Sequence, residues 1–461
     1  MDRRNFLGLA ATGAAGILPF SRRDREARTT AGRAMRGDPK SDPQAGGVVT
    51  PVSRRADVFL SHRLGTDHAE AISVMDMNGD GRPDIVSGAY WYENPGPAGV
   101  EWKRHQFRTM SVWPFHIAGE NKIEFCGDCI QFPVDVNHDG ATDLLTAAWQ
   151  TDGIWWYENP KRTGRFWNSH LICHSQATEG GVEADINGDG VADYAFAHYV
   201  PSNLIWINFA GAKPAVHSVG GKAADGHGVG VADINGDGKP DLLSIHGWLE
   251  NVDADRDKWI WHPEWELGEA GFPILGYDVN DDGKMDLIYG HGHNFGLYWV
   301  EQRIRNGKRT WKRHVIDESF SEAHALKLAD IDRDGEPELI TGKRYRGDPD
   351  PGLYEPLCIF YYKIDRRTAT FTRFPVSYNG TAEIGTQVIV TDIDGDGDQD
   401  ILVAGKTGVH WLENLRVDKV PASVREKELW LNVNWPFVGE TGPGSAEGHE
   451  PNSASIVKCG G

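Results

Sequence analysis

The sequence predicts an all-β fold, a seven-bladed β-propeller, and three observations lead to it. The nine-residue pattern D-x-[ND]-x-D-G-x-x-[DE] occurs seven times in 461 residues, with successive copies 45 to 62 residues apart. This spacing suits propeller blades. Short apolar runs flank each copy, and a third run often carries Trp-x-Glu-Asn. Four short strands in each of seven units make a propeller of seven blades.

The first unit shows the four expected strands in order. Residues 71–75 form an apolar run before the acidic loop, and 84–87 form another after it. The third strand is Trp91-Tyr92-Glu93-Asn94, and the fourth is expected around Trp102-Lys103-Arg104-His105. Alternating apolar and aromatic residues with turn residues between them are typical of such strands.

The two ends of the repeat region predict how the ring closes. The last unit stops after its third strand at Asn414, whereas residues 58–63 precede the first unit and resemble a fourth strand. Pairing the two would remove two open sheet edges. We therefore expect the N-terminal strand to complete the last blade, in a propeller that spans 57–415.

The segments outside the repeats have a different composition. Arg3 and Arg4, followed by Phe-Leu and a small apolar stretch, resemble a twin-arginine export signal, which we place at 1–30. Residues 31–56 are predicted to be a flexible linker and 416–461 a C-terminal extension. The protein is then exported to the periplasm or outside the cell. A disordered basic tail is the alternative for the N-terminus.

Composition excludes several classes of protein. There are 47 basic and 67 acidic residues, a formal net charge of −20, which disfavours nucleic-acid binding. After the N-terminal stretch no apolar run is long enough for a membrane-spanning helix. Five cysteines in so long a chain cannot form a dense disulfide framework. The sequence makes no prediction of oligomeric state.

The seven acidic loops are predicted to bind structural calcium. Carboxylate and amide oxygens at positions 1, 3, 5 and 9 surround one point, and glycine at position 6 permits a sharp turn. Oxygen-only ligands suit Ca²⁺, and position 12 lacks the glutamate of an EF-hand. Ordinary Asp-Gly hairpin turns are the alternative. The predicted ligands are Asp76, Asn78, Asp80, Asp84, Asp135, Asn137, Asp139, Asp143, Asp185, Asn187, Asp189, Asp193, Asp233, Asn235, Asp237, Asp241, Asp278, Asn280, Asp282, Asp286, Asp330, Asp332, Asp334, Glu338, Asp392, Asp394, Asp396 and Asp400.

A second set of polar residues is predicted at the opposite end of the innermost strands. Six residues before the loop, three units carry Glu179, His227 and His324, which are ligand types for one further divalent metal such as Zn, Mn or Mg. The returning strands end in further imidazoles and an amine, which we assign to proton transfer in an axial pocket. These candidate catalytic residues are His198, His246, His291, His293, Lys343 and Tyr345.

The acidic repeat with its Trp-Tyr-Glu-Asn strands resembles the FG-GAP/VCBS repeat family over about 57–415. Segments 291–299, 323–326 and 341–348 further resemble the propeller domain of the aldos-2-ulose (anhydrofructose) dehydratases. That resemblance implies a divalent metal and β-elimination on a keto-sugar. We expect a carbon–oxygen lyase that acts on a carbohydrate, either a keto-sugar or a uronic sugar. The cupin region that follows the propeller in those enzymes is absent here.

Two other functions stay open at this level. A non-catalytic propeller that binds a glycan or a protein would match the adhesion members of the repeat family. Catalysis predicts the axial histidines around one point, whereas adhesion predicts them dispersed. A hydrolase would need a carboxylate pair, which the sequence does not assign.

Overall fold

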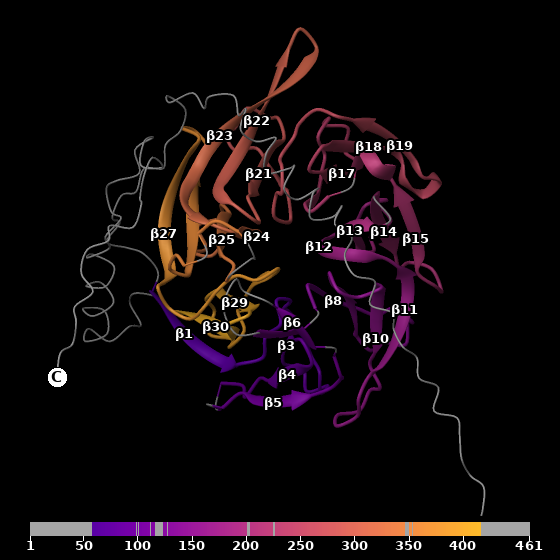
Figure 1. The fold of residues 1–461 in the computed structure, drawn as a ribbon, viewed down its shortest axis with the longest axis vertical. Helices are drawn as coiled ribbons and strands as arrows, with labels where there is room; N and C mark the ends of the chain where they lie inside the picture. The colour runs from indigo at the N-terminus through magenta and orange to yellow at the C-terminus, as the bar shows by residue number, and fades with distance from the viewer. Residues whose placement is uncertain are drawn as a thin grey trace, which may run out of the picture. The chain divides into compact units, whose positions relative to one another are not determined.

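The computed structural model describes residues 58–415, except positions 98, 100, 111, 116–122, 127, 201–202, 225, 346–349 and 353. Seven four-stranded antiparallel sheets form a ring of blades (Figure 1). The expected seven-bladed β-propeller is therefore confirmed. The predicted export signal, linker and C-terminal extension lie outside the described residues.

Blades one to four follow one another along the chain, each running from its innermost to its outermost strand. Their strands are β2 (Ser73–Met75), β3 (Asp84–Ser87), β4 (Tyr90–Glu93) and β5 (Lys103–Gln106); β8 (Ile130–Val134), β9 (Asp143–Ala147), β10 (Gly153–Glu158) and β11 (Asn168–His174); β12 (Gln176–Ala184), β13 (Asp193–Val200), β14 (Asn203–Asn208) and β15 (Ala215–Val219); and β16 (Val229–Ala232), β17 (Asp241–Ser244), β18 (Gly247–Asp253) and β19 (Lys258–His262).

Blades five to seven keep the same order, and the last takes its outer strand from the N-terminus. Their strands are β20 (Leu275–Tyr277), β21 (Asp286–Gly290), β22 (Phe295–Arg305) and β23 (Lys308–Ser321); β24 (Ala323–Ala329), β25 (Glu338–Lys343), β26 (Cys358–Asp365) and β27 (Thr370–Tyr378); and β28 (Val388–Thr391), β29 (Asp400–Gly405), β30 (Gly408–Leu415) and β1 (Val58–Gly65).

The ring closes through its two ends, as the sequence predicted. Strand β1 pairs antiparallel with β30, with Val58 opposite Leu415 and Arg63 opposite His410. Phe59 on β1 packs into the apolar core shared by the sixth and seventh blades, next to Tyr361. On the axis the amide of Thr386 donates to the carbonyl of Glu70, which joins the last blade to the first.

A stacked pair of rings recurs on the outer half of six blades. In the first blade His105 of the outermost strand stacks on Trp91, with ring centroids 4.3 Å apart, and its Nε2 lies 2.9 Å from Glu93. The corresponding rings are His170–Trp156, His217–Trp206, His262–Trp248, His314–Trp299 and His62–Trp411. These histidines fasten the fourth strand to the third.

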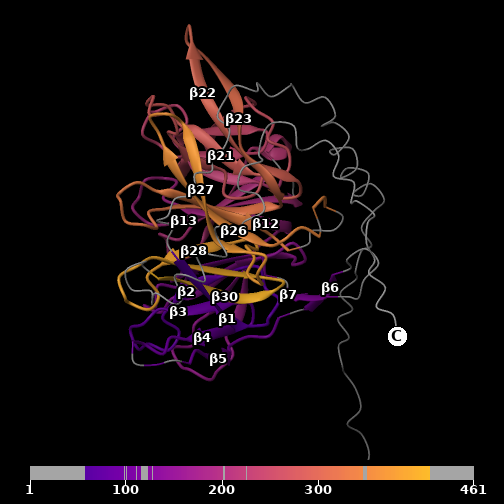
Figure 2. The same cartoon turned by 90° about the vertical axis from the view of Figure 1, so that its left-hand side faces the viewer.

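Several features were not predicted from the sequence. Strands β6 (Val112–Phe115) and β7 (Ile123–Cys126) form a separate hairpin between the first two blades. Strands β22 and β23 are unusually long and extend beyond the rest of their blade (Figure 2). Two short 3₁₀ turns are η2 (Gly221–Ala224) and η3 (Ala254–Arg256). Over the described part of the chain, no helix has the length and apolar character to cross a bilayer.

Candidate functional site

Four side chains from four successive blades meet on the propeller axis. Glu179 comes from β12, and His227 lies two residues before β16. His293 is in the turn between β21 and β22, and His324 is the second residue of β24. One potential ligand atom from each lies within 4.8 Å of all the others. These four residues are called the axial cluster below.

The ligand atoms of the axial cluster are close enough to share one ion. His227 Nε2 is 3.3 Å from Glu179 Oε2 and 3.2 Å from His293 Nε2. His324 Nε2 is 3.6 Å from the other carboxylate oxygen, Glu179 Oε1. Glu179, His227 and His324 are buried. Three imidazoles and a carboxylate form a donor set that suits a transition metal such as Zn better than calcium.

Neighbouring groups orient two of the imidazoles. His227 Nδ1 donates to the carbonyl of Ala270, at 2.8 Å, and His293 Nδ1 lies 2.7 Å from the carboxylate of Asp350. A carbonyl can only accept, so Nδ1 of His227 carries a proton and Nε2 is the ring nitrogen that faces the cluster. This outer hydrogen bond is typical of histidines that bind metals.

Small and apolar residues let the rings approach. A Cβ atom on Gly292 would lie 3.0 Å from both His227 Cε1 and His324 Cδ2. Phe272 packs against His324 and His227, with ring centroids 4.8 and 5.4 Å apart. Its amide also donates to the carbonyl of His324, which links the fifth blade to the sixth.

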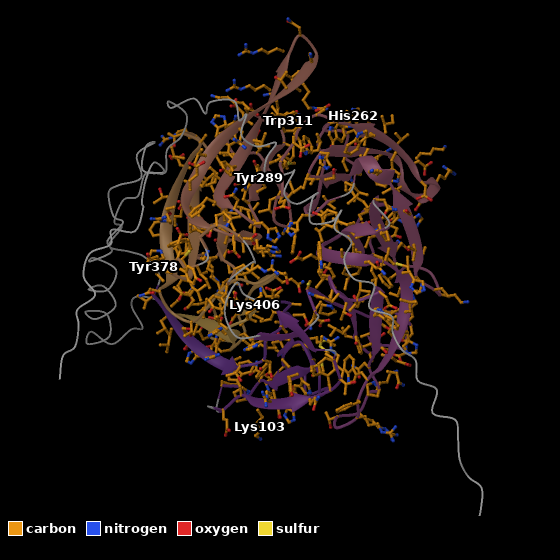
Figure 3. The ribbon with its side chains drawn as sticks, viewed as in Figure 1. Lys103, His262, Tyr289, Trp311, Tyr378 and Lys406 are labelled. Carbon is orange, nitrogen blue, oxygen red and sulfur yellow. The ribbon has the colours of Figure 1, made fainter. Side chains whose placement is uncertain are left out.

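Arg344 connects the axial cluster to a second group of charges. Its guanidinium lies 2.8 Å from Glu179 Oε1 and 2.8 Å from His324 Nε2. Nε and NH2 donate to the two oxygens of Glu70, at 2.6 and 2.7 Å, and Lys406 also pairs with Glu70. Figure 3 shows Lys406 toward the middle of the ring, whereas Lys103 lies at its rim.

These contacts set the charge states of the cluster. Burial raises the pKa of Glu179, but Arg344 and the two neighbouring imidazoles more than offset it and hold the pKa well below its ordinary value. Burial, followed by Arg344, lowers the pKa of His324 well below the usual range. Burial also disfavours charge on His293, yet the carboxylate of Asp350 raises its pKa overall.

A second potential ligand set shares Glu179 with the axial cluster. Ligand atoms of Glu70, Cys129 and Glu179 lie within 4.8 Å of one another. Arg344 already pairs with both carboxylates of this set. Burial raises the pKa of the Cys129 thiol well above its usual value, so the sulfur carries no charge to balance a further cation.

The structure brings some predicted residues together and separates others. Glu179, His227 and His324, predicted as metal ligands, lie together with His293, which was predicted to be catalytic. His246 lies away from them, partly exposed, and pairs with Glu266 at 2.7 Å. Sequence spacing places His246 at the strand end but does not fix which way its ring points.

The other candidate catalytic residues also lie outside the axial cluster. His198 is fully buried opposite Thr178 in β12, and burial lowers its pKa to about 4. His291 packs its ring against Tyr298, at 5.3 Å between centroids. The ammonium of Lys343 donates to Ser321, and the amide of Tyr345 donates to Glu383.

Two residues at the site were missed by the sequence analysis. Arg344, the neighbour of Lys343, is the residue whose side chain reaches the cluster; because successive side chains of a strand point to opposite sides, a one-residue error exchanged them. Asp350 comes from the connection between β25 and β26, and its position relative to the repeat carries no signal.

The seven acidic loops share a backbone feature that explains why position 6 is glycine. The sixth-position glycine has a positive φ in all seven loops, between 75° and 99°, as expected. In the first loop Asp76 accepts the amides of Gly79 and Gly81, at 2.7 and 2.8 Å. The side-chain oxygen Oδ1 of Asn78 accepts a hydrogen bond from the backbone amide of Asp80, at 2.9 Å.

The ninth-position acid is buried beneath the loop. Asp84 accepts the amides of Met77 and Asn94, at 2.9 and 2.8 Å, so it ties the loop to the third strand. Burial raises its pKa to about 6, and burial raises that of Asp400 in the seventh blade to about 7. The acid therefore has a structural role that sequence spacing did not reveal.

The outer oxygens of the loops form the donor set that fits calcium. In the seventh loop Asp392, Asp394 and Asp396 place carboxylate oxygens within 4.8 Å of one another, and the sixth loop does the same with Asp330, Asp332 and Glu338. Such exclusively oxygen donors suit a hard cation. In the sixth loop, Lys363 pairs with Asp332 and Asp334. Calcium binding stays a prediction.

Comparison with known proteins identifies the repeat. FG-GAP-like repeats match residues 135–196, 185–244 and 278–341. No curated protein sequence matches the chain. Among solved structures, rhamnogalacturonan lyase YesW is 13% identical over 83% of this chain and 80% of its own, with a TM-score of 0.38. The chain therefore carries FG-GAP-like repeats within a closed ring of seven β-propeller blades.

Proposed function

We propose that the protein is an exported, calcium-stabilised propeller that acts as a metal-assisted carbohydrate lyase, removing a β-leaving group from a keto-sugar or a uronic sugar at the axial cluster. The observation that carries the proposal is the convergence of Glu179, His227, His293 and His324 from four blades, with ligand atoms within 4.8 Å. Folding does not require one acid and three imidazoles from four different blades to meet at one point.

The residues present fit a divalent metal. His227 and His293 offer Nε2 atoms, because Ala270 and Asp350 engage their Nδ1 atoms. Glu179 carries a negative charge, since its pKa is held well below the ordinary value. A divalent ion bound there would polarise a substrate carbonyl and so acidify the adjacent C–H bond.

The chain supplies the remaining parts of an elimination. His324 is uncharged because burial and Arg344 lower its pKa, and its Nε2 accepts a hydrogen bond from Arg344 that helps to hold the guanidinium at the site. The fixed guanidinium of Arg344 favours negative charge developing on an adjacent oxygen. Phe272 covers His227 and His324 with an apolar ring and limits the access of water to them.

The carbohydrate class has a separate basis. It rests on the resemblance of segments 291–299, 323–326 and 341–348 to aldos-2-ulose dehydratases. The first two of these segments contain His293 and His324 of the axial cluster. Export rests on the twin-arginine pattern near the N-terminus. The proposed metal site and the proposed sugar class are therefore supported by different observations, and the experiment below examines each.

The test combines metal analysis with turnover. Purified protein is loaded with Zn²⁺, Mn²⁺ or Mg²⁺ in excess Ca²⁺ and incubated with keto-sugars and with uronate oligosaccharides. Elimination gives an unsaturated product, detected as new ultraviolet absorbance and confirmed by mass. We expect His324→Ala to abolish turnover and His262→Ala, at the outer rim, to retain it. Normal turnover by His324→Ala would overturn the site assignment, and bound sugar without product would favour a binding propeller.

A further inference from the structure

Arg344 is fixed in place by its contact with Glu70. Nε and NH2 donate to the two carboxylate oxygens of Glu70 at 2.6 and 2.7 Å, a bidentate arrangement that defines the plane of the guanidinium. Lys406 pairs with the same carboxylate, and Glu70 and Arg344 are both buried. The position of the remaining nitrogen, NH1, is therefore set by this contact.

NH1 engages the lone pair of His324 that a metal would need. NH1 of Arg344 is 2.8 Å from His324 Nε2. Arginine stays protonated in proteins and can only donate, so the imidazole nitrogen accepts. The other ring nitrogen, Nδ1, is buried and has no hydrogen-bond partner among the described residues. His324 consequently offers no free lone pair toward the cluster while Arg344 is in place.

The other three members are arranged differently. The Nε2 atoms of His227 and His293 are 3.2 Å apart, and Glu179 Oε2 is 3.3 Å from the former. Glu179 Oε1 is taken by NH2 of Arg344 at 2.8 Å, so the carboxylate presents a single oxygen to the two histidines. Arg344 thus divides the cluster into three accessible donors and one engaged imidazole.

We propose that Arg344 is a positioning residue that withholds His324 from the axial metal, so that Glu179, His227 and His293 alone hold the ion. Structural zinc sites use four protein ligands, whereas catalytic sites use three and keep positions open for water or substrate. An open coordination position is where the carbonyl oxygen of a substrate would bind in an elimination. This inference rests on the metal centre of the proposed function and specifies its ligands.

Cobalt binding tests the ligand count without any substrate. Co²⁺ replaces zinc, and the intensity of its visible absorption reports coordination number; four-coordinate sites absorb much more strongly than six-coordinate ones. Excess Ca²⁺ keeps the acidic loops occupied. In the wild-type protein we expect the weak absorption of an open, water-filled site. In Arg344→Met, which releases His324, we expect stronger absorption and about tenfold tighter Co²⁺ binding, an effect typical of outer-shell changes.

Two further variants keep the test decisive if Arg344→Met folds poorly. His324→Ala in the otherwise unchanged chain should leave Co²⁺ affinity within about twofold, because His324 is not a ligand in this arrangement. Loss of a residue that contributes to metal binding would weaken the affinity by about tenfold or more. His227→Ala should abolish binding. Arg373→Met is the matched control, because Arg373 is a buried arginine of the same blade that pairs with Asp317 at 2.7 Å. It should not change the cobalt spectrum.

The outcomes separate the inference from the proposed function. If His324→Ala weakens Co²⁺ binding as much as His227→Ala, the three-ligand inference is wrong while the metal centre stands. An Arg344→Met protein that folds and shows an unchanged spectrum and affinity overturns it as well. Absence of Co²⁺ binding at the axial cluster in the wild-type protein overturns the metal centre itself.

Discussion

The carbonyl of Ala270 accepts a hydrogen bond from Nδ1 of His227 at 2.8 Å, and this contact turns Nε2 toward Glu179. The two residues belong to adjacent blades, because His227 precedes β16 and Ala270 precedes β20. The orientation of the His227 imidazole therefore depends on the assembled propeller, and a single repeat unit would not provide it.

Replacing His227 tests whether this ring is a metal ligand. His227→Ala should lower the affinity for Zn²⁺ by more than about 100-fold, since loss of a ligand exceeds the loss of an outer-shell partner. His262→Ala removes an imidazole that stacks on Trp248 at the rim, and it should leave the affinity unchanged. Isothermal titration in excess Ca²⁺ measures both. Equal affinities for the two variants would remove His227 from the site.

Gly292 is a position where one methyl group should disturb the site. A Cβ atom there would lie 3.0 Å from His227 and His324, closer than ordinary van der Waals contact, so the rings must separate. Gly292→Ala should therefore weaken Zn²⁺ binding, by about tenfold, while the thermal unfolding curve changes little. Gly211→Ala is the control, because a Cβ atom on Gly211 would have only one atom within 4 Å, at 3.5 Å. Unchanged affinity in Gly292→Ala, with Gly211→Ala as control, would contradict the packing argument.

Closure of the last blade should contribute measurably to stability. Phe59 is buried in the core of the sixth and seventh blades, whereas its neighbour Leu60 is 43% exposed. Phe59→Ala should cost about 3 kcal/mol, and Leu60→Ala should cost well below about 1 kcal/mol. Chemical denaturation of the two variants compares them directly. Similar losses would mean that β1 contributes little through its buried face.

Buried His410 predicts acid sensitivity. Burial, followed by Arg63, lowers its pKa to about 4, against about 6.5 in an unfolded chain. Between these values the unfolded chain binds a proton that the folded protein does not, so stability falls as the pH drops from about 6.5 to about 4. The shift corresponds to about 3 kcal/mol.

Substitution of His410 checks the sign of this effect. His410→Gln should flatten the dependence of the free energy of unfolding on pH across that window, relative to the wild-type protein. His105→Gln, on the exposed fourth strand of the first blade, should leave the slope as it is. An identical slope in the wild-type and His410→Gln proteins would show that the histidine is solvated or charged in the fold.

Removal of calcium should destabilise the blades. The formal charge of −20 and the clustered oxygens of the seventh loop favour a bound cation. A chelator should lower the melting temperature, and re-added Ca²⁺ should restore it. Asp394→Asn should reduce the response, while Asp152→Asn, an exposed acid outside the loops, should not. A melting temperature that ignores the chelator would support ordinary hairpin turns.

The sequence by itself determined the fold and predicted which residues gather at one end of the axis. The regular spacing of the D-x-[ND]-x-D-G loops gives seven equivalent hairpins. The last unit lacks a fourth strand, and an extra strand precedes the first unit, so pairing the two closes the propeller without leaving an open sheet edge; β1 and β30 make this pairing. Equivalence of the units then predicts that Glu179, His227 and His324 share one end of the axis, because a repeated backbone places matching positions at matching radii.

Tertiary structure decided which side chains meet. His246 shares its alignment position with other candidates, yet it pairs with Glu266, because a strand end does not fix a rotamer. Arg344 reaches the cluster in place of Lys343 through the alternation of the strand and the buried carboxylate of Glu70. Asp350 and the carbonyl of Ala270 come from irregular connections. Their contacts depend on the packing between blades, which no local pattern in the sequence encodes.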